Sequence, residues 1–538
     1  MVRLGQADPA RRLAQRTLRL APIDAGSWLA LASLATESPI AAARRAVRSE
    51  PFTADAWNVL GLALQRAGKP GAACLALRTA LALAPDMAAA WNNLAAALLL
   101  QRDTARSAAA FGRAGRLAPD KASISSNALF GMNYDPGVSD ADLAEAHRAW
   151  GERAVRLAPR FTIKHTASFS DGPLTLGFIS PDFKRHPVGY FLLPLLENLD
   201  RSRFRVICYS DVGTADDITD AVRHLADGWR PVTGQPDAAI ASLILADKVD
   251  ILVDLAGHTA GNRLTLFAGR VAPLQISWLG YFHSTGLPTM DALLSDAETV
   301  PDRARSQFVE QVVHLPAGRL CYAPPVQAPE PCGPPMLITG YPTFGSFNNV
   351  SKLSAEVVSL WAAILKDCPG SRLLLKWHTL SDPRERAGLE RAFADYGVPS
   401  DRLLLRGPSQ HDSMLAEYGD VDVALDPFPF TGCLTTCEAL WMGVPVVTLA
   451  GTRPVARQGV AFLNQLGRSD LIAASPDDYR AIAKRLVSTP ADLVSARRQQ
   501  REAMRTRLCD GRSFSQSFEL VLAELWRGTG SRSRERSS

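Results

Sequence analysis

Residues 51–119 read PFTADAWNVLGLALQRAGKPGAACLALRTALALAPDMAAAWNNLAAALLLQRDTARSAAAFGRAGRLAP and repeat with a period of 34 residues. The repeated positions are Pro51, Pro85, Pro119, Trp57 and Trp91. Between the prolines, Leu and Ala recur at the spacing of two helices, with Gly68-Lys69-Pro70 as the turn of one unit. Because proline cannot donate to the preceding helical turn, each proline ends a second helix. The stretch therefore predicts a stack of helix–turn–helix units.

A 34-residue helical period that ends in proline is the signature of tetratricopeptide repeats. Leu-Ala-Pro also occurs at residues 20–22 and 157–159, so the array extends to both sides, with irregular units at its two ends. We predict a repeat domain over residues 1–160. Such units stack into a superhelix whose concave face suits extended peptides. Peptide binding is the functional hypothesis, and a purely structural solenoid is its alternative.

Composition places the chain among ordinary globular proteins. It has 538 residues, of which 47% are hydrophobic and 21% charged, which suggests about two to four domains. No stretch approaches the ~20 consecutive apolar residues of a membrane span, and the basic N-terminus lacks the apolar core of a secretory signal. We therefore expect a cytoplasmic protein without a membrane partner, and we expect residues 529–538 to form a basic disordered tail.

Charge and cysteine usage exclude two further classes of function. The net charge is only +5 and no basic patch is interleaved with aromatic residues, so we expect no nucleic-acid partner. The eight cysteines are scattered, and the closest pair, Cys433 and Cys437, lacks the further Cys or His ligands of a zinc site. We expect reduced thiols.

After a linker at 161–173, short apolar strands alternate with helices. The strands expected first are 174–180, 205–210, 249–256 and 274–281. A proline-rich stretch follows, and the alternation restarts with strands at 343–347, 372–377, 402–405, 421–426 and 445–449. This pattern predicts two parallel, doubly wound domains, residues 172–325 and 336–528, whose ligands bind outside the carboxyl ends of the strands. Neither a dinucleotide fingerprint nor a P-loop is present, which argues against NAD enzymes and P-loop NTPases.

The most informative segment for chemistry is Asp426–Trp441, DPFPFTGCLTTCEALW. A strand enters a Pro/Gly turn, and hydroxyl residues then open a helix. Free N–H groups and the positive end of the helix dipole suit an anion, and Thr435 and Thr436 add hydroxyl donors. We place Glu438 in the first turn of this helix. A nucleotide-sugar diphosphate with its ribose fits these features, whereas plain helix capping is the alternative.

Two other strand ends carry candidate residues. In Phe347–Lys352, a lysine at a helix start opposes the helix dipole, so we interpret Lys352 as the cation that neutralises a departing diphosphate. In Ser180–Tyr190, His186 lies just past the first strand of the first α/β domain, where an imidazole could act as a base or orient an acceptor hydroxyl. A structural role for this histidine is the alternative.

Further polar clusters follow two other strands of the first α/β domain. The residues expected to line the cleft are His258, Tyr281, Thr285 and Gly286. Asp420-Val421-Asp422 is similar to the Asp-x-Asp metal motif of some glycosyltransferases, but it lies at the start of a buried strand rather than its end. We therefore interpret it as structural and predict no metal site.

Taken together, these segments closely resemble the O-linked N-acetylglucosamine transferase family, especially its bacterial members. The likeness covers nearly the whole chain. Its most specific elements are 180–190, 256–263, 278–286, 347–352 and 432–443. The resemblance implies a tetratricopeptide-repeat solenoid followed by an α/β catalytic region of two Rossmann-like domains, the GT-B arrangement. It also implies inverting, metal-independent transfer of GlcNAc from UDP-GlcNAc to Ser or Thr hydroxyls of proteins.

The resemblance also implies roles for individual residues. Lys352 holds the β-phosphate, with Asn349 beside it. The helix start that follows Gly432 meets the phosphates through Thr435 and Thr436, and Glu438 meets the ribose. His186 corresponds to an active-site histidine that acts as base or positions the acceptor, since a donor phosphate oxygen is the alternative base. Asn93 fits an asparagine ladder along the repeat groove, where the protein acceptor lies.

This chain departs from the family pattern at several positions. Leu434 stands where many relatives carry a third threonine, Phe282-His283 replaces the more usual Pro-Gly, and Val59 occupies the ladder position one repeat before Asn93. Donor class is therefore better determined than the exact sugar or acceptor. The alternatives are transfer of another hexose to Asn, a UDP-sugar epimerase, and a non-catalytic repeat scaffold.

Overall fold

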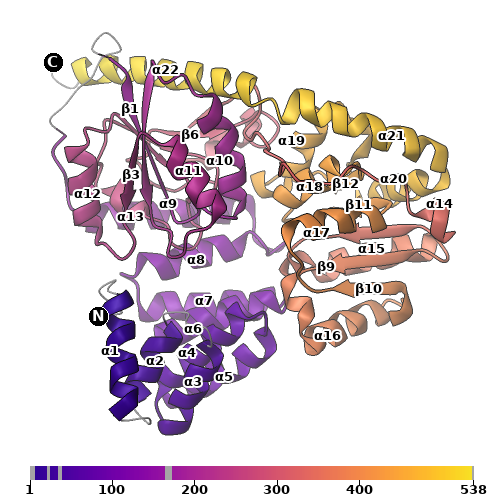
Figure 1. The fold of residues 1–538 in the computed structure, drawn as a ribbon, viewed down its shortest axis with the longest axis horizontal. Helices are drawn as coiled ribbons and strands as arrows, with labels where there is room; N and C mark the ends of the chain where they lie inside the picture. The colour runs from indigo at the N-terminus through magenta and orange to yellow at the C-terminus, as the bar shows by residue number, and fades with distance from the viewer. Residues whose placement is uncertain (1–6, 21–24, 34–38, 164–171, 536–538) are drawn as a thin grey trace. The chain divides into compact units, whose positions relative to one another are not determined.

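The computed structural model describes residues 7–20, 25–33, 39–163 and 172–535 (Figure 1). Packing divides the chain into two compact units. Unit 1 comprises Met1–Pro136, Ser346–Lys366 and Arg372–Ser409, and unit 2 comprises Gly137–Gly345, Asp367–Ser371 and Gln410–Ser538. The division passes through the second α/β region, so each unit holds part of it.

The amino-terminal part is helical, as the repeat period predicts. Its helices are α1 (Ala7–Leu20), α2 (Ala25–Ser33), α3 (Pro39–Ser49), α4 (Ala54–Arg66), α5 (Pro70–Leu83), α6 (Ala88–Leu100), α7 (Thr104–Leu117), α8 (Ala122–Met132) and α9 (Asp140–Leu157). Helices α4 to α7 form two successive antiparallel pairs (Figure 1). The proline of the Leu-Ala-Pro at 20–22 lies outside the described residues.

Local chemistry explains where these helices begin and end. Pro70 occupies the first turn of α5, and Gly68 adopts φ +70° in the turn before it, a conformation that glycine reaches without strain. The indole N–H of Trp57 donates to the carbonyl of Pro51 at 2.7 Å, and Trp91 repeats this contact with Pro85 at 2.8 Å. The spacing of proline and tryptophan in the sequence is therefore a repeated bond that joins each helix start to the preceding turn.

Small side chains let the repeat helices pack closely. Fully buried alanines face one another between successive helices, together with buried leucines such as Leu77 and Leu94. Helices that meet through alanine approach with little side-chain bulk, so a continuous core forms along the stack. This core lies within unit 1.

The first α/β region contains a seven-stranded parallel sheet in the order β3-β2-β1-β4-β5-β6-β7. Its strands are β1 (Leu174–Ser180), β2 (Phe204–Ser210), β3 (Gly228–Pro231), β4 (Ile251–Asp254), β5 (Leu274–Ser277), β6 (Ala292–Ser295) and β7 (Gln311–His314). Its helices are α10 (Pro187–Asn198), α11 (Asp217–Leu225), α12 (Asp237–Ala246) and α13 (Leu264–Ala268). Every residue of β1 is buried, as expected for a central parallel strand.

The second sheet has six strands in the order β10-β9-β8-β11-β12-β13. Its strands are β8 (Thr343–Ser346), β9 (Arg372–Lys376), β10 (Leu403–Arg406), β11 (Val423–Leu425), β12 (Val446–Leu449) and β13 (Ile472–Ala473). The helices of this part are α14 (Met336–Thr339), α15 (Ala355–Asp367), α16 (Pro383–Ala394), α17 (His411–Ala416), α18 (Leu434–Trp441), α19 (Gln458–Gln465), α20 (Pro476–Ser488), α21 (Pro490–Ala503) and α22 (Gly511–Glu535). The first six strands of sheet one and the six of sheet two share one order.

Helix α22 returns the end of the chain to the first sheet, within unit 2. It packs on α10, where the Ser515 hydroxyl donates to the carbonyls of Pro194 and Leu195 at 3.5 and 3.4 Å. The carboxylate of Glu519 accepts from the backbone N–H of Asp200 at 2.8 Å. The last helix of the second α/β region therefore packs against the first α/β region.

The predicted architecture is confirmed, with differences at its boundaries. Strands β3, β6, β7 and β13 are absent from the sequence prediction. Helix α9 falls with the first sheet rather than with the predicted repeat domain 1–160. Helix α22 continues to Glu535, into the stretch from 529 for which the sequence analysis expects a disordered tail. Residues 536–538 lie outside the described part.

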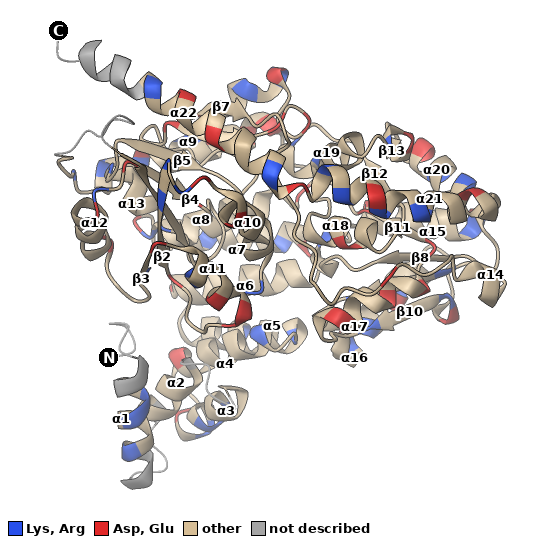
Figure 2. Ribbon diagram, turned by 45° about the horizontal axis from the view of Figure 1, so that its top comes forward, with Lys and Arg blue, Asp and Glu red and all other residues tan. Residues whose placement is uncertain are grey.

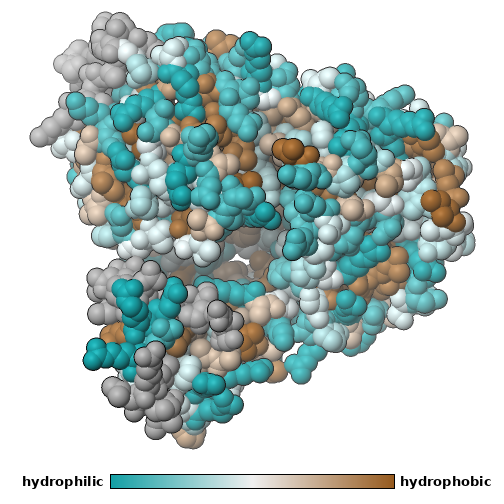
Figure 3. Space-filling view, in the orientation of Figure 1, coloured by the Kyte–Doolittle hydropathy of each residue, from teal (hydrophilic) through white to brown (hydrophobic). Residues whose placement is uncertain are grey.

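The proline-rich linker between the α/β regions is irregular except for the single turn of α14. Three of its apolar side chains are exposed: Val326, Leu337 and Ile338. The apolar surface of α14 is visible in Figure 3. Among the described residues, no helix combines the length and apolar character needed to cross a bilayer.

Acidic and basic residues are intermixed along the ribbon in Figure 2. Many pair locally, such as Arg480 with Asp367 at 2.9 Å and Arg230 with Asp247 at 2.6 Å. Both of these pairs are partly buried.

Candidate active site

The loop after β11 is built to present a helix amino-terminus. The carboxylate of Asp426 accepts the N–H of Gly432 at 2.6 Å through one oxygen and the hydroxyl of Thr448 at 2.8 Å through the other. The hydroxyl of Thr431 donates to the carbonyl of Val455 at 2.7 Å. These buried bonds fix the loop immediately before α18, whose first N–H groups have no partner within the helix.

The Thr436 hydroxyl at this helix start is buried and has no hydrogen-bond partner in the structure. A buried, unsatisfied hydroxyl costs about 1–3 kcal/mol unless a ligand or water completes it. A side chain at Gly432 would overlap this hydroxyl and approach that of Thr435 to 3.0 Å. The absence of a side chain at 432 therefore leaves space beside both threonine hydroxyls, as an anion seat requires.

Glu438 differs from its predicted position. It is the fifth residue of α18 and lies in the second turn, because the helix begins only at Leu434. Its carboxylate is buried and accepts from His411 Nε2 at 2.8 Å. Burial raises the pKa of Glu438, and the hydrogen bond and charge of His411 oppose that rise.

His411 in turn faces Tyr190, so three side chains from three helices form one chain of contacts. The hydroxyl of Tyr190 lies 3.1 Å from His411 Nδ1. Sequence reasoning quoted Tyr190 only as part of a motif and missed His411 altogether. Its signal was weak, because His411 opens a six-residue helix and has no recognisable motif around it.

Lys352 also differs in its local structure. It ends a short 3₁₀ turn, Val350–Lys352, and α15 begins three residues later, so it does not occupy the first turn of an α-helix. The side chain of Asn349 accepts from the N–H of Ser351 at 3.0 Å and thereby shapes this turn. The ammonium of Lys352 donates to Asn348 Oδ1 at 3.1 Å. Lys352 belongs to unit 1 and α18 to unit 2, and their joint action stays a prediction.

His186 caps the helix that follows β1. Its Nδ1 accepts from the N–H of Val188 at 3.3 Å and lies 3.8 Å from Asp182 Oδ2. Burial lowers its pKa, while Asp182 acts in the opposite direction. A neutral histidine that accepts through Nδ1 carries its proton on Nε2. In this arrangement the free ring nitrogen is a hydrogen-bond donor.

The four residues predicted to line the cleft lie in the interior of unit 2. The rings of His258 and Tyr281 pack against α9, where the Tyr281 hydroxyl lies 2.9 Å from His147 Nε2. His258 Nε2 lies 3.0 Å from the carbonyl of Thr285, and the Thr285 hydroxyl donates to the carboxylate of Glu310. All four are buried, including Gly286. These four residues therefore do not line an open cleft. The sequence could not reveal that α9 covers them.

Gly286 explains why α9 approaches this loop so closely. It adopts φ +75°, and a side chain there would overlap the backbone of His147. A side chain at Gly151 of α9 would likewise overlap the carbonyl of Gly286. Two glycines thus permit a backbone-to-backbone contact that holds α9 against the first sheet.

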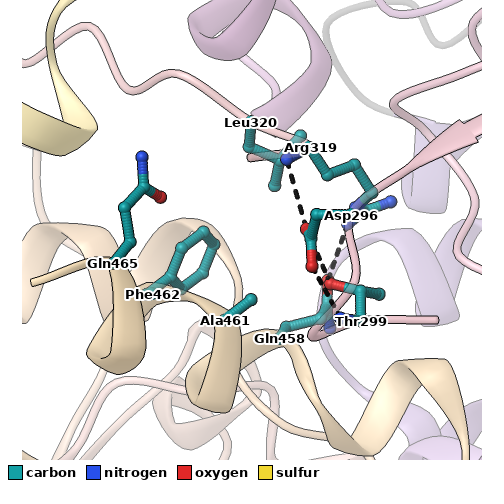
Figure 4. A pocket seen from close by; sticks show the side chains of 8 residues that line it. All are labelled: Asp296, Thr299, Arg319, Leu320, Gln458, Ala461, Phe462 and Gln465. Carbon is teal, nitrogen blue, oxygen red and sulfur yellow. Dashed lines mark hydrogen bonds between the residues drawn. The ribbon is translucent and has the colours of Figure 1, made fainter. Parts of the chain in front are cut away.

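A second connection within unit 2 joins the loop after β5 to the loop before α18. The buried guanidinium of Arg319 donates to the carbonyl of Tyr281 at 3.3 Å and to Gln458 Oε1 at 3.2 Å. Gln458 Nε2 lies 3.5 Å from the carbonyl of Thr431. Figure 4 shows Arg319 beside Asp296 and Thr299, opposite the α19 side chains Phe462 and Gln465. Sequence reasoning missed Arg319 because no motif surrounds it.

In the repeats, Asn93 joins a network that spans successive units. Its amide donates to Asn58 Oδ1 at 2.9 Å, and the amide of Asn127 donates to Asn92 Oδ1 at 3.0 Å. The two bonds join positions one repeat apart in the same way. Val59 occupies the ladder position of the preceding repeat, and its neighbour Asn58 makes the hydrogen bond to Asn93. Whether this surface binds peptide stays a prediction.

Asp422 has the structural role expected for the Asp-x-Asp sequence. Its buried carboxylate accepts the N–H groups of Thr343 at 2.8 Å and Met336 at 3.1 Å. Burial raises the pKa of Asp422, and Arg497 opposes that rise. Its oxygens thus bind the backbone at the first residue of β8 and the first residue of α14.

Comparison with known proteins gives a consistent result. The sequence profile of glycosyl transferase family 41 matches residues 142–321 and 340–520. The chain is 39% identical over 408 residues to the tomato (Solanum lycopersicum) protein described as probable UDP-N-acetylglucosamine–peptide N-acetylglucosaminyltransferase SPINDLY, covering 74% of this chain and 44% of that protein. It is 28% identical over 371 residues to the Arabidopsis thaliana protein SEC of the same description, covering 66% and 37%. The chain thus spans less than half the length of these curated relatives.

Among solved structures, a mutant of the Thermobaculum terrenum O-GlcNAc transferase superposes with a TM-score of 0.88 at 32% sequence identity. The match covers 98% of this chain and 99% of that one. A likeness of this extent includes the repeats and both α/β regions.

Proposed function

The chain belongs to glycosyl transferase family 41, and from that premise we propose that it transfers N-acetylglucosamine from UDP-N-acetylglucosamine to Ser or Thr hydroxyls of proteins. We propose that the transfer inverts the anomeric centre and needs no metal ion. The descriptions of the relatives support the donor and the peptide acceptor. The observation that carries the proposal in the structure is the start of α18, where buried Thr436 has a hydroxyl without a partner.

The chemistry follows from where charge develops. The acceptor oxygen attacks the anomeric carbon as the bond to the β-phosphate breaks, and UDP departs with the bonding electrons. The N–H groups at the start of α18 and the Thr435 and Thr436 hydroxyls supply preorganised donors to that departing charge. Lys352 adds a cation, and Asn349 shapes the turn that carries it. Glu438 is proposed to accept from the ribose hydroxyls.

In this proposal His186 orients the acceptor rather than removing its proton. Its Nδ1 accepts from the first turn of α10, so the neutral ring offers Nε2–H as a donor. The hydroxyl proton then passes to an oxygen of the donor phosphate. The loss of Nε2–H should raise the acceptor KM more than it lowers kcat.

The repeats are proposed to hold the protein acceptor along the surface that contains Asn93. The bonds from Asn93 to Asn58 and from Asn127 to Asn92 give this surface a repeated polar pattern that can meet the backbone of an extended chain. None of the eight cysteines forms a disulfide, which supports the proposal of a cytoplasmic location, where thiols stay reduced.

The test is transfer to a Ser/Thr-containing peptide from a panel of UDP-sugars and GDP-sugars, with and without EDTA. Mass spectrometry identifies the added sugar and its residue, and NMR identifies the anomer. Selective use of UDP-N-acetylglucosamine, a β-linked product and full activity in EDTA are expected. Loss of activity in EDTA that added metal restores would contradict the metal-free mechanism. Modified Asn, a free epimerised sugar, or nucleotide binding without turnover would support the hexose-to-Asn, epimerase or scaffold alternatives instead.

A further inference from the structure

Tyr190, His411 and Glu438 connect the helix start of His186 to the proposed nucleotide site. Tyr190 is the fourth residue of α10 and lies one helical turn from the capping residue His186. His411 opens α17, and Glu438 lies in α18. All three belong to unit 2. Two short contacts join them: 3.1 Å from the Tyr190 hydroxyl to His411 Nδ1, and 2.8 Å from His411 Nε2 to Glu438 Oε1.

The proton positions on His411 set the direction of each hydrogen bond in this chain of contacts. An ionised Glu438 only accepts, so His411 must carry a proton on Nε2. In the neutral ring Nδ1 is then an acceptor, and the Tyr190 hydroxyl donates to it. In the charged ring Nδ1–H donates, and the Tyr190 oxygen accepts. The tyrosine hydroxyl therefore satisfies Nδ1 in either state, which a phenylalanine cannot do.

Burial shields this chain of contacts from water. The side chain of Glu438 is 3% exposed and that of His411 18%, so bulk water cannot easily replace a lost partner. The Tyr190 and His411 rings also contact each other, with centroids 5.2 Å apart. Burial raises the pKa of Tyr190 to about 12, so its hydroxyl keeps its proton at neutral pH. The hydroxyl is thus a permanent hydrogen-bonding group against the imidazole.

We propose that Tyr190 is a positioning residue for the donor nucleotide: through His411 it fixes the orientation of Glu438 and couples the helix start of His186 to that carboxylate. This inference rests on the proposed function, because it takes Glu438 as the group that meets the nucleotide. Tyr190 contacts no reacting atom in it. Its contribution is the correct placement of the carboxylate before the donor arrives.

The test is Tyr190→Phe in the full chain, which removes one hydroxyl and keeps the ring. We expect the Kd for UDP by calorimetry and the KM for the donor to rise about 3- to 10-fold, the effect of one net hydrogen bond. We expect kcat to change less than about twofold, because placement of the nucleotide precedes the chemical step. The matched control is Tyr209→Phe, which removes the bond from a buried tyrosine of β2 to Asp247 at 2.8 Å. It should leave both constants unchanged.

A double-mutant cycle separates positioning from general packing. In a His411→Ala background, Tyr190→Phe should have no further effect on the UDP Kd, since its action passes through the imidazole. An additive effect would overturn the proposal. Equal UDP affinity in the unmodified chain and in Tyr190→Phe would overturn this inference alone. No UDP binding by the unmodified chain would overturn the proposed function and this inference with it.

Discussion

The two sheets are alike at their amino ends and different at their carboxyl ends. Asp250, just before β4, binds Thr175 of β1 through its backbone N–H and its carboxylate, at 2.9 and 2.7 Å. Asp422, just before β11, makes the same pair of contacts to Thr343 of β8, both at 2.8 Å. At this edge the two α/β regions therefore use one structural solution twice.

At the carboxyl ends of the strands, one aspartate again begins each loop, but the two loops have different surroundings. Asp254 accepts the N–H groups of Ala256 and Gly257, and the loop that follows it is buried beneath α9. Asp426 accepts the N–H of Gly432, and its loop leads to a helix start with a hydroxyl that has no partner. The comparison teaches that the scaffold is duplicated while the two strand ends have diverged into packing and proposed binding.

The largest effect should come from the strand end of the second region. We expect Lys352→Ala to lower kcat by about 10²-fold or more, the effect of losing one preorganised electrostatic group. His186→Ala, at the corresponding position after β1, should lower kcat less, because the histidine is proposed to orient the acceptor. Steady-state kinetics on both variants measures the difference. Lys366→Ala, an exposed lysine of α15, is the control, and near-normal turnover in Lys352→Ala would remove Lys352 from the mechanism.

The two glycines that follow the paired aspartates should respond differently. Gly257 adopts φ +55°, and a side chain there would overlap Tyr281, so Gly257→Ala should lower the free energy of unfolding by about 2–3 kcal/mol. Gly432→Ala should instead push on the Thr435 and Thr436 hydroxyls and raise the donor KM about tenfold. Urea unfolding and kinetics measure the two effects. If both variants lost stability equally with an unchanged donor KM, the contrast between the loops would be lost.

Threonine hydroxyls provide a matched pair of smaller changes. Thr285→Val removes a donor to buried Glu310, so it should destabilise the fold by about 1–2 kcal/mol. Thr436→Val removes a hydroxyl that has no protein partner, so stability should be kept or should rise while the UDP Kd rises several-fold. Thermal unfolding with and without UDP distinguishes them. Unchanged UDP affinity in Thr436→Val would remove this hydroxyl from the proposed site.

The buried histidines where α9 meets the first sheet should make the first region sensitive to acid. Burial lowers the pKa of His147 to about 4 and that of His283 well below its usual value. The unfolded chain then binds more protons below pH 6.5, so stability present above that pH is lost as pH falls, by up to ~1.4 kcal/mol per pH unit for each histidine. His283→Phe should reduce this slope between pH 6.5 and 5, measured by urea unfolding.

The carboxyl groups near these histidines act with the opposite sign. Burial raises the pKa of Asp254 to about 6, so the folded chain keeps a proton that the unfolded chain releases above pH 3.8. Burial also raises the pKa of Glu310. The carboxyl groups of Asp254 and Glu310 are present in both the wild type and His283→Phe. The difference between these two proteins in the slope of unfolding free energy against pH therefore isolates the contribution of His283. His224→Gln, at an exposed position of α11, is the control, and an equal slope in His283→Phe would contradict the assignment.

Repeated sequence patterns made the fold predictable. The 34-residue period located the repeat helices because proline and tryptophan form the same local bond in each unit. A second repetition, Val-Asp-x-x-x-Asp at 249–254 and 421–426, escaped the sequence analysis and marks the equivalent strands of the two sheets. Short edge strands such as β13 were missed because two residues carry no detectable alternation.

The sequence by itself determined the order of repeats and α/β regions and the segments that follow the strands, since periodicity and turn chemistry act over a few neighbouring residues. Only the tertiary structure decided which of those segments are covered. His258 and Tyr281 became interior because α9, more than a hundred residues earlier, packs on them. Glu438 acquired His411 and Tyr190 as partners in the same way. Burial and hydrogen bonding between distant segments depend on how helices pack, and no local pattern encodes that.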